Sequence, residues 1–283
     1  MIPLGITSCW LKPIMIDLFW LILAGIGGGI LAGLLGIGGG IIYVLVLPYA
    51  LSNAGIPIEH FPQFIIANSI FGVLFASLTS NILNIHKRDF YLDESLWVGL
   101  PGALFSIFIL TTIVSQSWYS ITWFYVLLIL FLAFMLISFF LQRKKDLKKP
   151  KIKKREIRLG LAGIVGGSLA SLTGLGGGAA VVPILTTQLH LDIKMARSIS
   201  LAMIFITSVA LTAFNLVKNP GIDLLPYQYG YIYFPVALPL TLGVLLGTPI
   251  GSKLGRLFSS TTIKVLFSIL ILAVIIEKLI FLF

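Results

Sequence analysis

The sequence predicts an all-α, polytopic integral membrane protein built from two copies of one repeat. Of its 283 residues, 58% are hydrophobic and 11% are charged, whereas a soluble domain carries about 25% charged residues. So few charges cannot cover a water-facing surface, but they suffice for a surface that faces lipid. Because lipid offers the backbone no hydrogen-bond partners, the spans must be helices or a closed barrel. The apolar stretches are long and do not alternate with polar residues, which excludes the barrel.

About eight apolar runs follow one another along the chain, and each is expected to form membrane-embedded helix. They cover residues 18–48, 63–85, 96–115, 121–141, 159–186, 198–217, 231–251 and 263–283. The sequence therefore divides into an N-terminal segment (1–17), a first transmembrane repeat (18–141), a central loop (142–158) and a second transmembrane repeat (159–283).

The central loop carries most of the formal net charge of +10. It contains ten lysines and arginines and two acidic residues. Basic loops beside membrane helices stay on the cytoplasmic side, so we expect a cytoplasmic loop and a protein of the bacterial inner membrane. A site for nucleic acid or anionic lipid is the alternative reading. The orientation of the protein in the membrane is enough to explain the positive charge of this loop, so we expect no nucleic-acid partner.

The repeat is visible as a glycine-rich segment that occurs twice. Gly25–Leu47 and Gly163–Leu185 align at an offset of 138 with 13 of 23 positions identical. Weaker matches follow: Ala67-Asn68-Ser69 with Ser198-Ile199-Ser200, Asn84 with Asn215, and Pro101 with Pro239. Weak internal symmetry with interrupted helices at matching positions is typical of duplicated transporter folds.

Each glycine segment is expected to break into a half-helix, a loop and a second half-helix. Glycine destabilises a helix interior by about 1 kcal/mol per residue. Four glycines crowd the first break and four crowd the second: Gly36, Gly38, Gly39, Gly40, Gly174, Gly176, Gly177 and Gly178. A broken backbone survives at membrane depth only where protein or a water-filled cavity satisfies it.

Such a break predicts an anion site. The second half-helix presents free N–H groups at its start, where the helix dipole favours negative charge. We expect the two loops to approach each other near the membrane midplane and to line a site for a small oxyanion. Close helix packing through small residues is the alternative. It fits Gly25, Gly29, Gly33 and the row Gly243, Gly247, Gly251 and Gly255 better than binding does.

Polar residues inside apolar runs add candidates, because intramembrane polar groups tend to mark pathways. The candidates are the pairs Ser69/Ser200 and Asn84/Asn215, which recur at matching positions of the two halves, and Asn68, which lies in the second run beside Ser69. Interhelical hydrogen bonding is the structural alternative for each. Glu277 and Lys278 lie in the last run, where snorkelling to the membrane surface is favoured over a proton relay.

The motifs GLLGIGGGIIYVLVLP (33–48) and SLTGLGGGAAVVPIL (171–185) resemble the paired signature of the TauE/SafE family of sulfite exporters, also called TSUP. The resemblance extends over nearly the whole chain, through the basic central loop and Pro101-Gly102. It implies transport of sulfite, thiosulfate or an organosulfonate such as taurine. The family has a Gly-Thr-Ser-like triplet after each glycine segment, and here only Ser69 and Ser200 match it.

We therefore expect a secondary transporter of a small sulfur oxyanion working by alternating access, with a proton or sodium ion as coupling partner. An anion channel, an intramembrane enzyme and a non-transporting membrane assembly protein remain alternatives. An intramembrane enzyme would need a carboxylate or histidine pair deep in the apolar runs, and the runs offer almost none. The sequence also has no glycine-lysine loop of the ATP-binding kind. One cysteine and three scattered histidines predict no metal site and no cofactor.

The charges also predict that the repeats are inverted. If each glycine segment is a re-entrant hairpin, each repeat crosses the membrane three times, an odd number, and the second is inverted. Lys87, Arg88, Lys194, Arg197, Lys253 and Arg256 then share the side of the central loop, as the positive-inside bias prefers. Lys12, Lys218 and Lys278 fall on the other side. Eight full spans with parallel repeats are the alternative.

Overall fold

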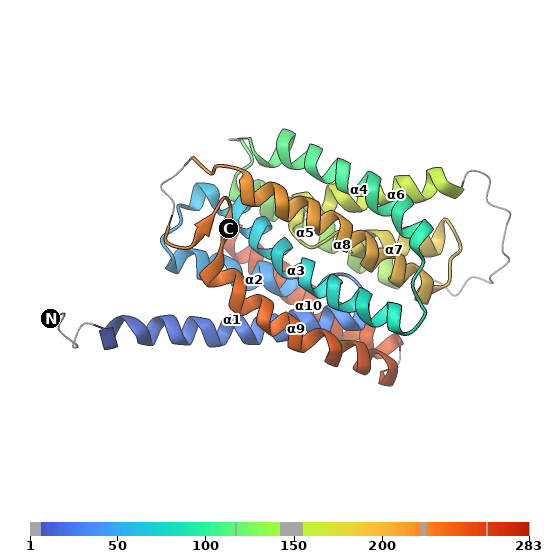
Figure 1. The fold of residues 1–283 in the computed structure, drawn as a ribbon, viewed down its shortest axis with the longest axis horizontal. Helices are drawn as coiled ribbons and strands as arrows, with labels where there is room; N and C mark the ends of the chain where they lie inside the picture. The colour runs from blue at the N-terminus through green and yellow to red at the C-terminus, as the bar shows by residue number, and fades with distance from the viewer. Residues whose placement is uncertain (1–6, 117, 142–154, 222–224, 259, 283) are drawn as a thin grey trace.

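A computed structural model describes residues 7–116, 118–141, 155–221, 225–258 and 260–282 (Figure 1). Most of the central basic loop lies outside these residues. The elements in chain order are α1 (Thr7–Leu35), α2 (Gly40–Asn53), the 3₁₀ turn η1 (Ile58–His60), α3 (Phe61–His86), α4 (Leu92–Ile109), the π-helical turn η2 (Leu110–Val114), α5 (Ile121–Leu141), α6 (Arg155–Thr173), α7 (Gly178–Thr187), α8 (Ile193–Val217), β1 (Gln228–Tyr229), β2 (Ile232–Tyr233), α9 (Phe234–Leu257) and α10 (Ser260–Leu282).

The predicted all-α, polytopic membrane fold is confirmed. Within the described ranges, seven helices are long and apolar enough to cross a membrane. They cover Leu18–Leu35, Ile58–His86, Leu92–Val114, Ile121–Ser138, Ile193–Val217, Phe234–Gly255 and Val265–Leu282. The two second half-helices, α2 and α7, are shorter. The strands β1 and β2 form a two-stranded antiparallel hairpin just before α9.

Each glycine segment doubles back on itself (Figure 1). The half-helix α2 turns back along α1, and a Cβ added to Gly28 of α1 would overlap the Tyr43 ring of α2. In the second half, α7 turns back along α6, where a Cβ at Gly166 would overlap Val181. Both segments therefore have the shape of a hairpin rather than of a single straight span.

Small residues bring the half-helices α1 and α6 against long helices of the other half. Glycines of α1 face the row of glycines on α9, so that a Cβ added at Gly243, Gly247 or Gly251 would overlap a carbonyl oxygen of α1. On α6, Gly163 and Gly167 approach the backbone of α4 in the same way. The packing role predicted for the α1 and α9 glycines is confirmed. Small residues allow this approach because nothing projects between the two backbones.

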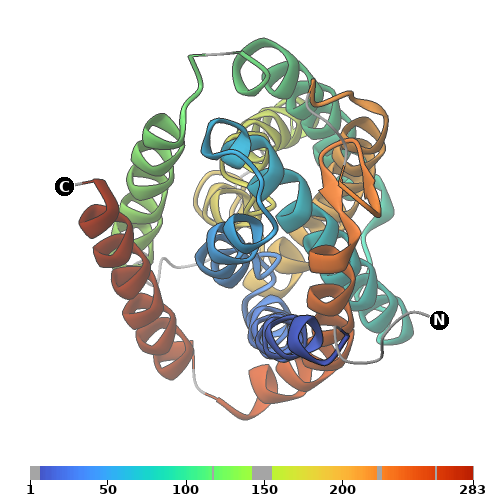
Figure 2. The same ribbon diagram turned by 90° about the vertical axis from the view of Figure 1, so that its left-hand side faces the viewer.

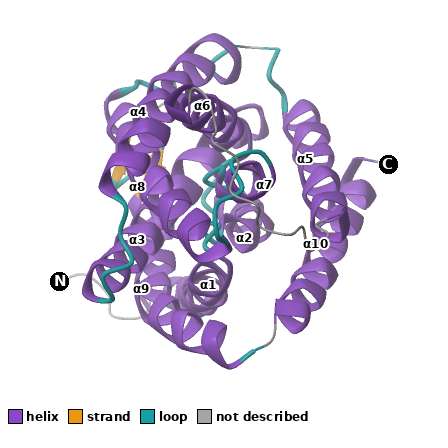
Figure 3. Ribbon diagram, turned by 90° about the vertical axis from the view of Figure 1, so that its right-hand side faces the viewer, coloured by secondary structure: helices purple, strands orange, loops and turns teal. Residues whose placement is uncertain are grey.

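The two halves interlock. The most extensive helix contacts join the halves: α1 with α9, α4 with α6 and α8, and α3 with α8 and α9. Viewed along the bundle, α2 and α7 lie inside, while α5 and α10 lie together at one edge (Figures 2 and 3). The glycine loops are thereby enclosed by helices of both halves.

The bundle has two distinct ends. At one end, Lys194 pairs with Asp89 at 2.8 Å and Lys87 donates to Ser252 at 3.0 Å, while exposed Lys253 follows Ser252. We call this the basic end. The other, called the opposite end, holds the starts of α3 and α9 and the end of α8, which the β1–β2 hairpin joins (Figure 1).

Candidate functional site

The two glycine loops have nearly identical backbones. Helix α1 ends at Leu35 and α2 begins at Gly40, while α6 ends at Thr173 and α7 begins at Gly178. The φ angles of Gly36, Gly38 and Gly39 are 73°, 87° and 71°, and those of Gly174, Gly176 and Gly177 are 71°, 85° and 71°. Left-handed backbone at three of four successive residues requires glycine. The predicted break in each glycine segment is thus observed at the predicted residues.

Both second half-helices begin without a side-chain cap. The N-cap residues are Gly39 for α2 and Gly177 for α7, and neither supplies a side-chain hydrogen bond. The first amides of a helix have no partner within the helix, and the dipole makes that end electropositive. The loops therefore offer two electropositive backbone ends with no cationic side chain of their own.

The two loops touch each other between α3 and α8. A Cβ added to Gly40 would lie 2.8 Å from Leu175 Cα, and one added to Gly178 would lie 3.3 Å from the Gly36 carbonyl oxygen. Val73 and Ile204, close to the middle of α3 and α8, each contact both loops, at Gly38 and at Gly176. The structure thus brings all eight predicted loop glycines into one crossing point, which we call the loop crossover.

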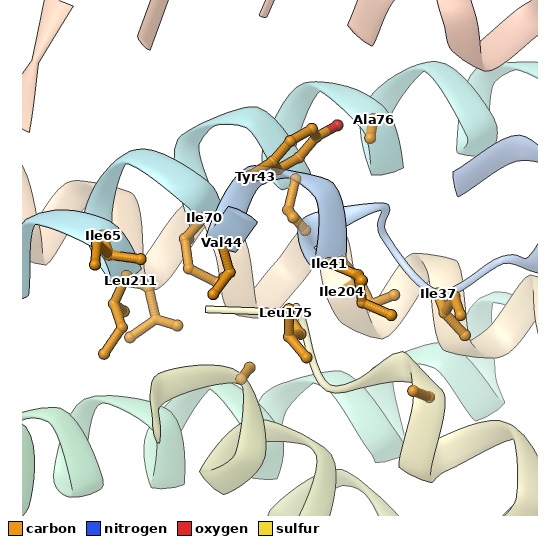
Figure 4. Packing of buried hydrophobic residues seen from close by; sticks show 14 of the residues in the cluster. Ile37, Ile41, Tyr43, Val44, Ile65, Ile70, Ala76, Leu175, Ile204 and Leu211 are labelled. Atoms are coloured by element: carbon orange, nitrogen blue, oxygen red, sulfur yellow. The ribbon is translucent and has the colours of Figure 1, made fainter. Parts of the chain in front are cut away.

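Apolar side chains close the loop crossover. Ile37, Ile41, Leu175 and Ile204 gather where the loops meet (Figure 4), and all four are buried. Val73 is fully buried beside them. The contact between the two loops is therefore made by buried apolar side chains.

Ser69 and Ser200 are the predicted polar residues that lie at the crossover. Ser69 Oγ donates to the Gly174 carbonyl oxygen at 2.7 Å, and Ser200 Oγ donates to the Gly178 carbonyl oxygen at 3.4 Å. Both side chains are fully buried. Each serine thus bonds a residue of the second glycine loop.

A polar cavity of about 510 Å³ opens at the basic end, next to the first glycine loop. It is lined by Gly33, Ser80, Asn84, Lys87, Asp89, Lys194, Arg197, Ser198, Leu201, Ser252 and Gly255. Asn84 is the predicted site residue in this set. With three cations against one carboxylate, the lining attracts anions, because a cleft with walls of one sign focuses the potential.

Arg197 joins this cavity to the first glycine loop. Its Nη2 atom donates to the Leu34 carbonyl oxygen and, at 3.4 Å, to that of Gly33, at the end of α1. A Cβ added to Gly36 would lie 3.3 Å from Arg197 Cβ and 3.4 Å from Nε. The Nε atom is buried and has no hydrogen-bond partner among the described residues.

Asn68 and Asn215 lie toward the opposite end. Asn68 Nδ2 donates to the carbonyl oxygens of Phe64 and Tyr231, and its Oδ1 accepts from the Tyr233 amide at 3.0 Å. The Asn215 carbonyl oxygen accepts from the Tyr231 amide at 3.0 Å. Both residues hold the β1–β2 hairpin, so the Asn68 side chain bonds a different element from that of its neighbour Ser69, and neither asparagine lines the cavity that contains Asn84.

These helices and loops match a known family. The profile described as "Sulfite exporter TauE/SafE" matches residues 16–277, which is almost the entire chain. The chain belongs to the TauE/SafE family.

Two relatives of this chain are named as transporters. The chain is 29% identical to a "Probable membrane transporter protein" of Haemophilus influenzae, over 77% of this chain and 81% of that protein. It is also 29% identical to a "Probable membrane transporter protein" of Methanocaldococcus jannaschii, over 77% of this chain and 79% of that protein. No solved structure matches significantly. Together with seven candidate spans, the family identifies a multi-pass integral membrane transporter.

The sequence of this TauE/SafE chain pointed to the glycines but not to Arg197. From the sequence, Arg197 was used only to predict which side of the membrane is cytoplasmic. It lies four residues after the start of α8, close to a predicted membrane surface. Its role as neighbour of Gly36 depends on a contact between residues about 160 positions apart. The available signal was an arginine directly before Ser198-Ile199-Ser200, the segment that matches 67–69.

Lys278 corrects the snorkelling interpretation. Its side chain is 2% exposed and pairs with Glu277 at 2.7 Å. Its Nζ atom lies 4.9 Å from the centre of the Tyr125 ring on α5, instead of extending toward water. Snorkelling was expected because the residue is near the end of a helix, but the packing of α10 on α5 buries the ammonium group.

Proposed function

We propose that this TauE/SafE protein is a secondary transporter of a small sulfur oxyanion (sulfite, thiosulfate or an organosulfonate) that works by alternating access at the loop crossover. The family is described by sulfite export, and the curated relatives carry transporter names. In this proposal the basic end faces the cytoplasm, because cytoplasmic loops carry the excess of lysine and arginine.

The meeting of two uncapped helix N-termini carries the proposal. The starts of α2 and α7 lie at the loop crossover, where a Cβ added to Gly40 would lie 2.8 Å from Leu175 Cα and one added to Gly178 would lie 3.3 Å from the Gly36 carbonyl oxygen. An oxyanion has acceptor atoms on several sides, and backbone amides can bind it without a cationic partner at that depth. Broken helices with their N-termini turned toward an anionic group are a recurring feature of secondary transporters.

The closed crossover favours a carrier over an open pore. The polar cavity reaches the first loop from the basic end, while Val73 and Ile204 close the route beyond it. An anion in the cavity can proceed only if the two loops and the helices α3 and α8 rearrange. We infer that the structure is the conformation open to the basic end.

Flux into liposomes tests the proposal. Purified protein is reconstituted, and uptake of sulfite, thiosulfate and taurine is followed with and without a proton gradient. We expect saturable sulfite uptake with competition by one of the other two anions. Non-saturating uptake that follows voltage alone would indicate a channel. Flux of cations without any anion flux would refute the proposal.

A second arm tests whether the crossover is the pathway. The double variant Val73→Ala/Ile204→Ala removes side-chain volume from the apolar contact that closes the crossover. We therefore expect at least a several-fold rise in non-saturating anion leak. Ile271→Ala on α10 is the matched control, because Ile271 is also fully buried but lies outside the crossover. Equal leak in the two proteins would place the pathway elsewhere, even if sulfite transport itself is observed.

A further inference from the structure

The crossover is nearly symmetric in shape but not in charge. Gly36 and Gly174 occupy matching loop positions with φ angles of 73° and 71°. Gly36 faces Arg197, whereas Gly174 faces Ile66 and Ser69. The offset of 131 that relates Ser69 to Ser200 and Val73 to Ile204 also relates Ile66 to Arg197. The basic end therefore has a cation where the opposite end has a fully buried isoleucine.

Arg197 retains an unused donor in this position. Its bonds to the carbonyl oxygens of α1 use Nη2 and complete the end of that helix. Its Nε–H remains buried without a partner, and among the described residues Arg197 takes part in none of the three ion pairs. A buried donor on a charged group is strongly disfavoured unless an acceptor reaches it. An acceptor is thus expected beside Gly36.

A second unpartnered donor lines the same cavity. Ser80 is only 4% exposed and lines this cavity. Its Oγ atom is buried and has no hydrogen-bond partner among the described residues. The Asn84 side chain and Lys87 lie on the same wall of α3. Asp89, the one carboxylate of the lining, is occupied by Lys194. The cavity therefore offers donors and positive charge to an oxyanion.

We propose that Arg197 and Ser80 form an anion-binding subsite at the basic end that has no counterpart at the opposite end. This deepens the proposed function and rests on it. An oxyanion at this subsite is held by Arg197 before the loops rearrange. After rearrangement it meets Ile66 instead and is held by neutral donors alone. Capture is then tight from the cytoplasmic side and weak from the other, because affinity differs between the two states.

Sided kinetics test the subsite. Liposomes with wild-type protein or Arg197→Gln are loaded with sulfite inside or outside, and protein orientation is set by selective proteolysis or labelling. We expect the half-saturating sulfite concentration at the basic end to rise about 10- to 100-fold, as for loss of a charge-assisted hydrogen bond. At the opposite end it should change less than about threefold.

Matched variants separate binding from folding. Arg155→Gln removes the same charge at the same end, but Arg155 pairs with Glu94 outside the cavity, so we expect unchanged half-saturation. Arg197→Lys keeps the cation and should recover part of the affinity. Sulfite-induced thermal stabilisation in detergent supplies a readout without transport, and it should be lost in Arg197→Gln and reduced in Ser80→Ala.

The outcomes are distinct. Equal half-saturation at the basic end for wild type and Arg197→Gln, with a lower maximal rate, would make Arg197 only a cap of α1 and would overturn the subsite. If the wild type binds sulfite through Arg197 in the thermal assay but moves no anion, the transport proposal fails and the subsite stands. If sulfite stabilises neither protein while transport is observed, the subsite is overturned and the transport proposal stands.

Discussion

Individual glycines at the loop crossover serve two different purposes, and the atoms around each one separate them. A Cβ on Gly39 would overlap the Gly28 carbonyl oxygen, and one on Gly177 would overlap that of Gly166. These two glycines are required for packing. Gly36 instead faces the Arg197 side chain, so its neighbour is a flexible cation. The sequence could locate the breaks, since clustered glycines destabilise a helix wherever they occur. It could not assign each glycine, because the contacts come from the folded chain.

Gly39→Ala and Gly177→Ala are therefore expected to prevent stable folding. The new methyl group meets a backbone oxygen that cannot move aside, and φ near 71° disfavours any L-residue. We expect a loss of at least about 3 kcal/mol of stability, the sum of overpacking and left-handed strain. Thermal unfolding of the purified proteins measures it.

Gly55→Ala is the control for strain alone. Gly55 has a φ of 80° and nothing within 4 Å of an added Cβ. Its substitution should cost about 1 kcal/mol. If Gly39→Ala is no worse than Gly55→Ala, the packing role at the crossover is wrong.

Helices in this fold are held by contacts that cross between the halves, and these contacts rest on small residues. The predicted glycine rows of α1 and α9 pack on each other, whereas the pairing of α6 with α4 was not anticipated. The reason is that α4 contains only two glycines, Gly99 and Gly102, which do not repeat every fourth residue as the glycines of α9 do. Periodicity reveals which face of a helix is small, but it does not reveal which helix covers that face.

Substitutions along the glycine row of α9 are expected to destabilise the protein to different degrees. Gly247→Ala would place a methyl group on the Ile26 carbonyl oxygen and should separate α1 from α9. Gly255→Ala, in the same row, would find its nearest atoms 3.5–3.8 Å away, all from Leu34. We expect a marked fall of the unfolding midpoint for Gly247→Ala and almost none for Gly255→Ala. Equal midpoints would contradict the observed α1–α9 packing.

An ion pair within α10 places a buried ammonium group against α5. Lys278 is nearly fully buried against Glu277 and Tyr125, and Glu277 also accepts from Tyr49 of α2 at 3.3 Å. Removing one partner of a buried pair leaves an uncompensated charge, at about 3 kcal/mol or more. Glu277→Gln should therefore destabilise the protein strongly.

The double variant Glu277→Gln/Lys278→Met removes both charges and should recover most of that loss. Thermal unfolding of both variants gives the comparison. A double variant less stable than Glu277→Gln alone would show that Lys278 stabilises α10 without its partner.

At the scale of the whole molecule, we infer that the two halves are inverted repeats. The helix contacts occur in matching pairs: α1 with α9 and α6 with α4, α2 with α3 and α7 with α8, and α4 with α8 and α9 with α3. The helices α3 and α8 contact each other, as do α5 and α10, as expected of elements beside a twofold axis. Sequence identity between the halves is strong in the glycine segments and sparse elsewhere, so the helix contacts supply the pattern that the side chains do not.

Inversion makes a prediction about sidedness that can be measured in intact cells. If both doubled-back glycine segments are re-entrant hairpins (Figure 1), each half contributes three full crossings, α3 to α5 and α8 to α10, and the apolar stretch Leu18–Leu35 of α1 does not complete a crossing. Lys253 then shares the cytoplasmic side with the central loop, while exposed Glu59 lies at the opposite end. In a background without Cys9, a cysteine at position 253 should be protected from an impermeant maleimide and one at position 59 should react. Permeabilised cells should label both positions, which controls for burial. Equal labelling of both positions in intact cells would instead support parallel repeats of four crossings each, because three crossings from the cytoplasmic central loop, through α6–α7, α8 and α9, would then place the end of α9 on the outer side.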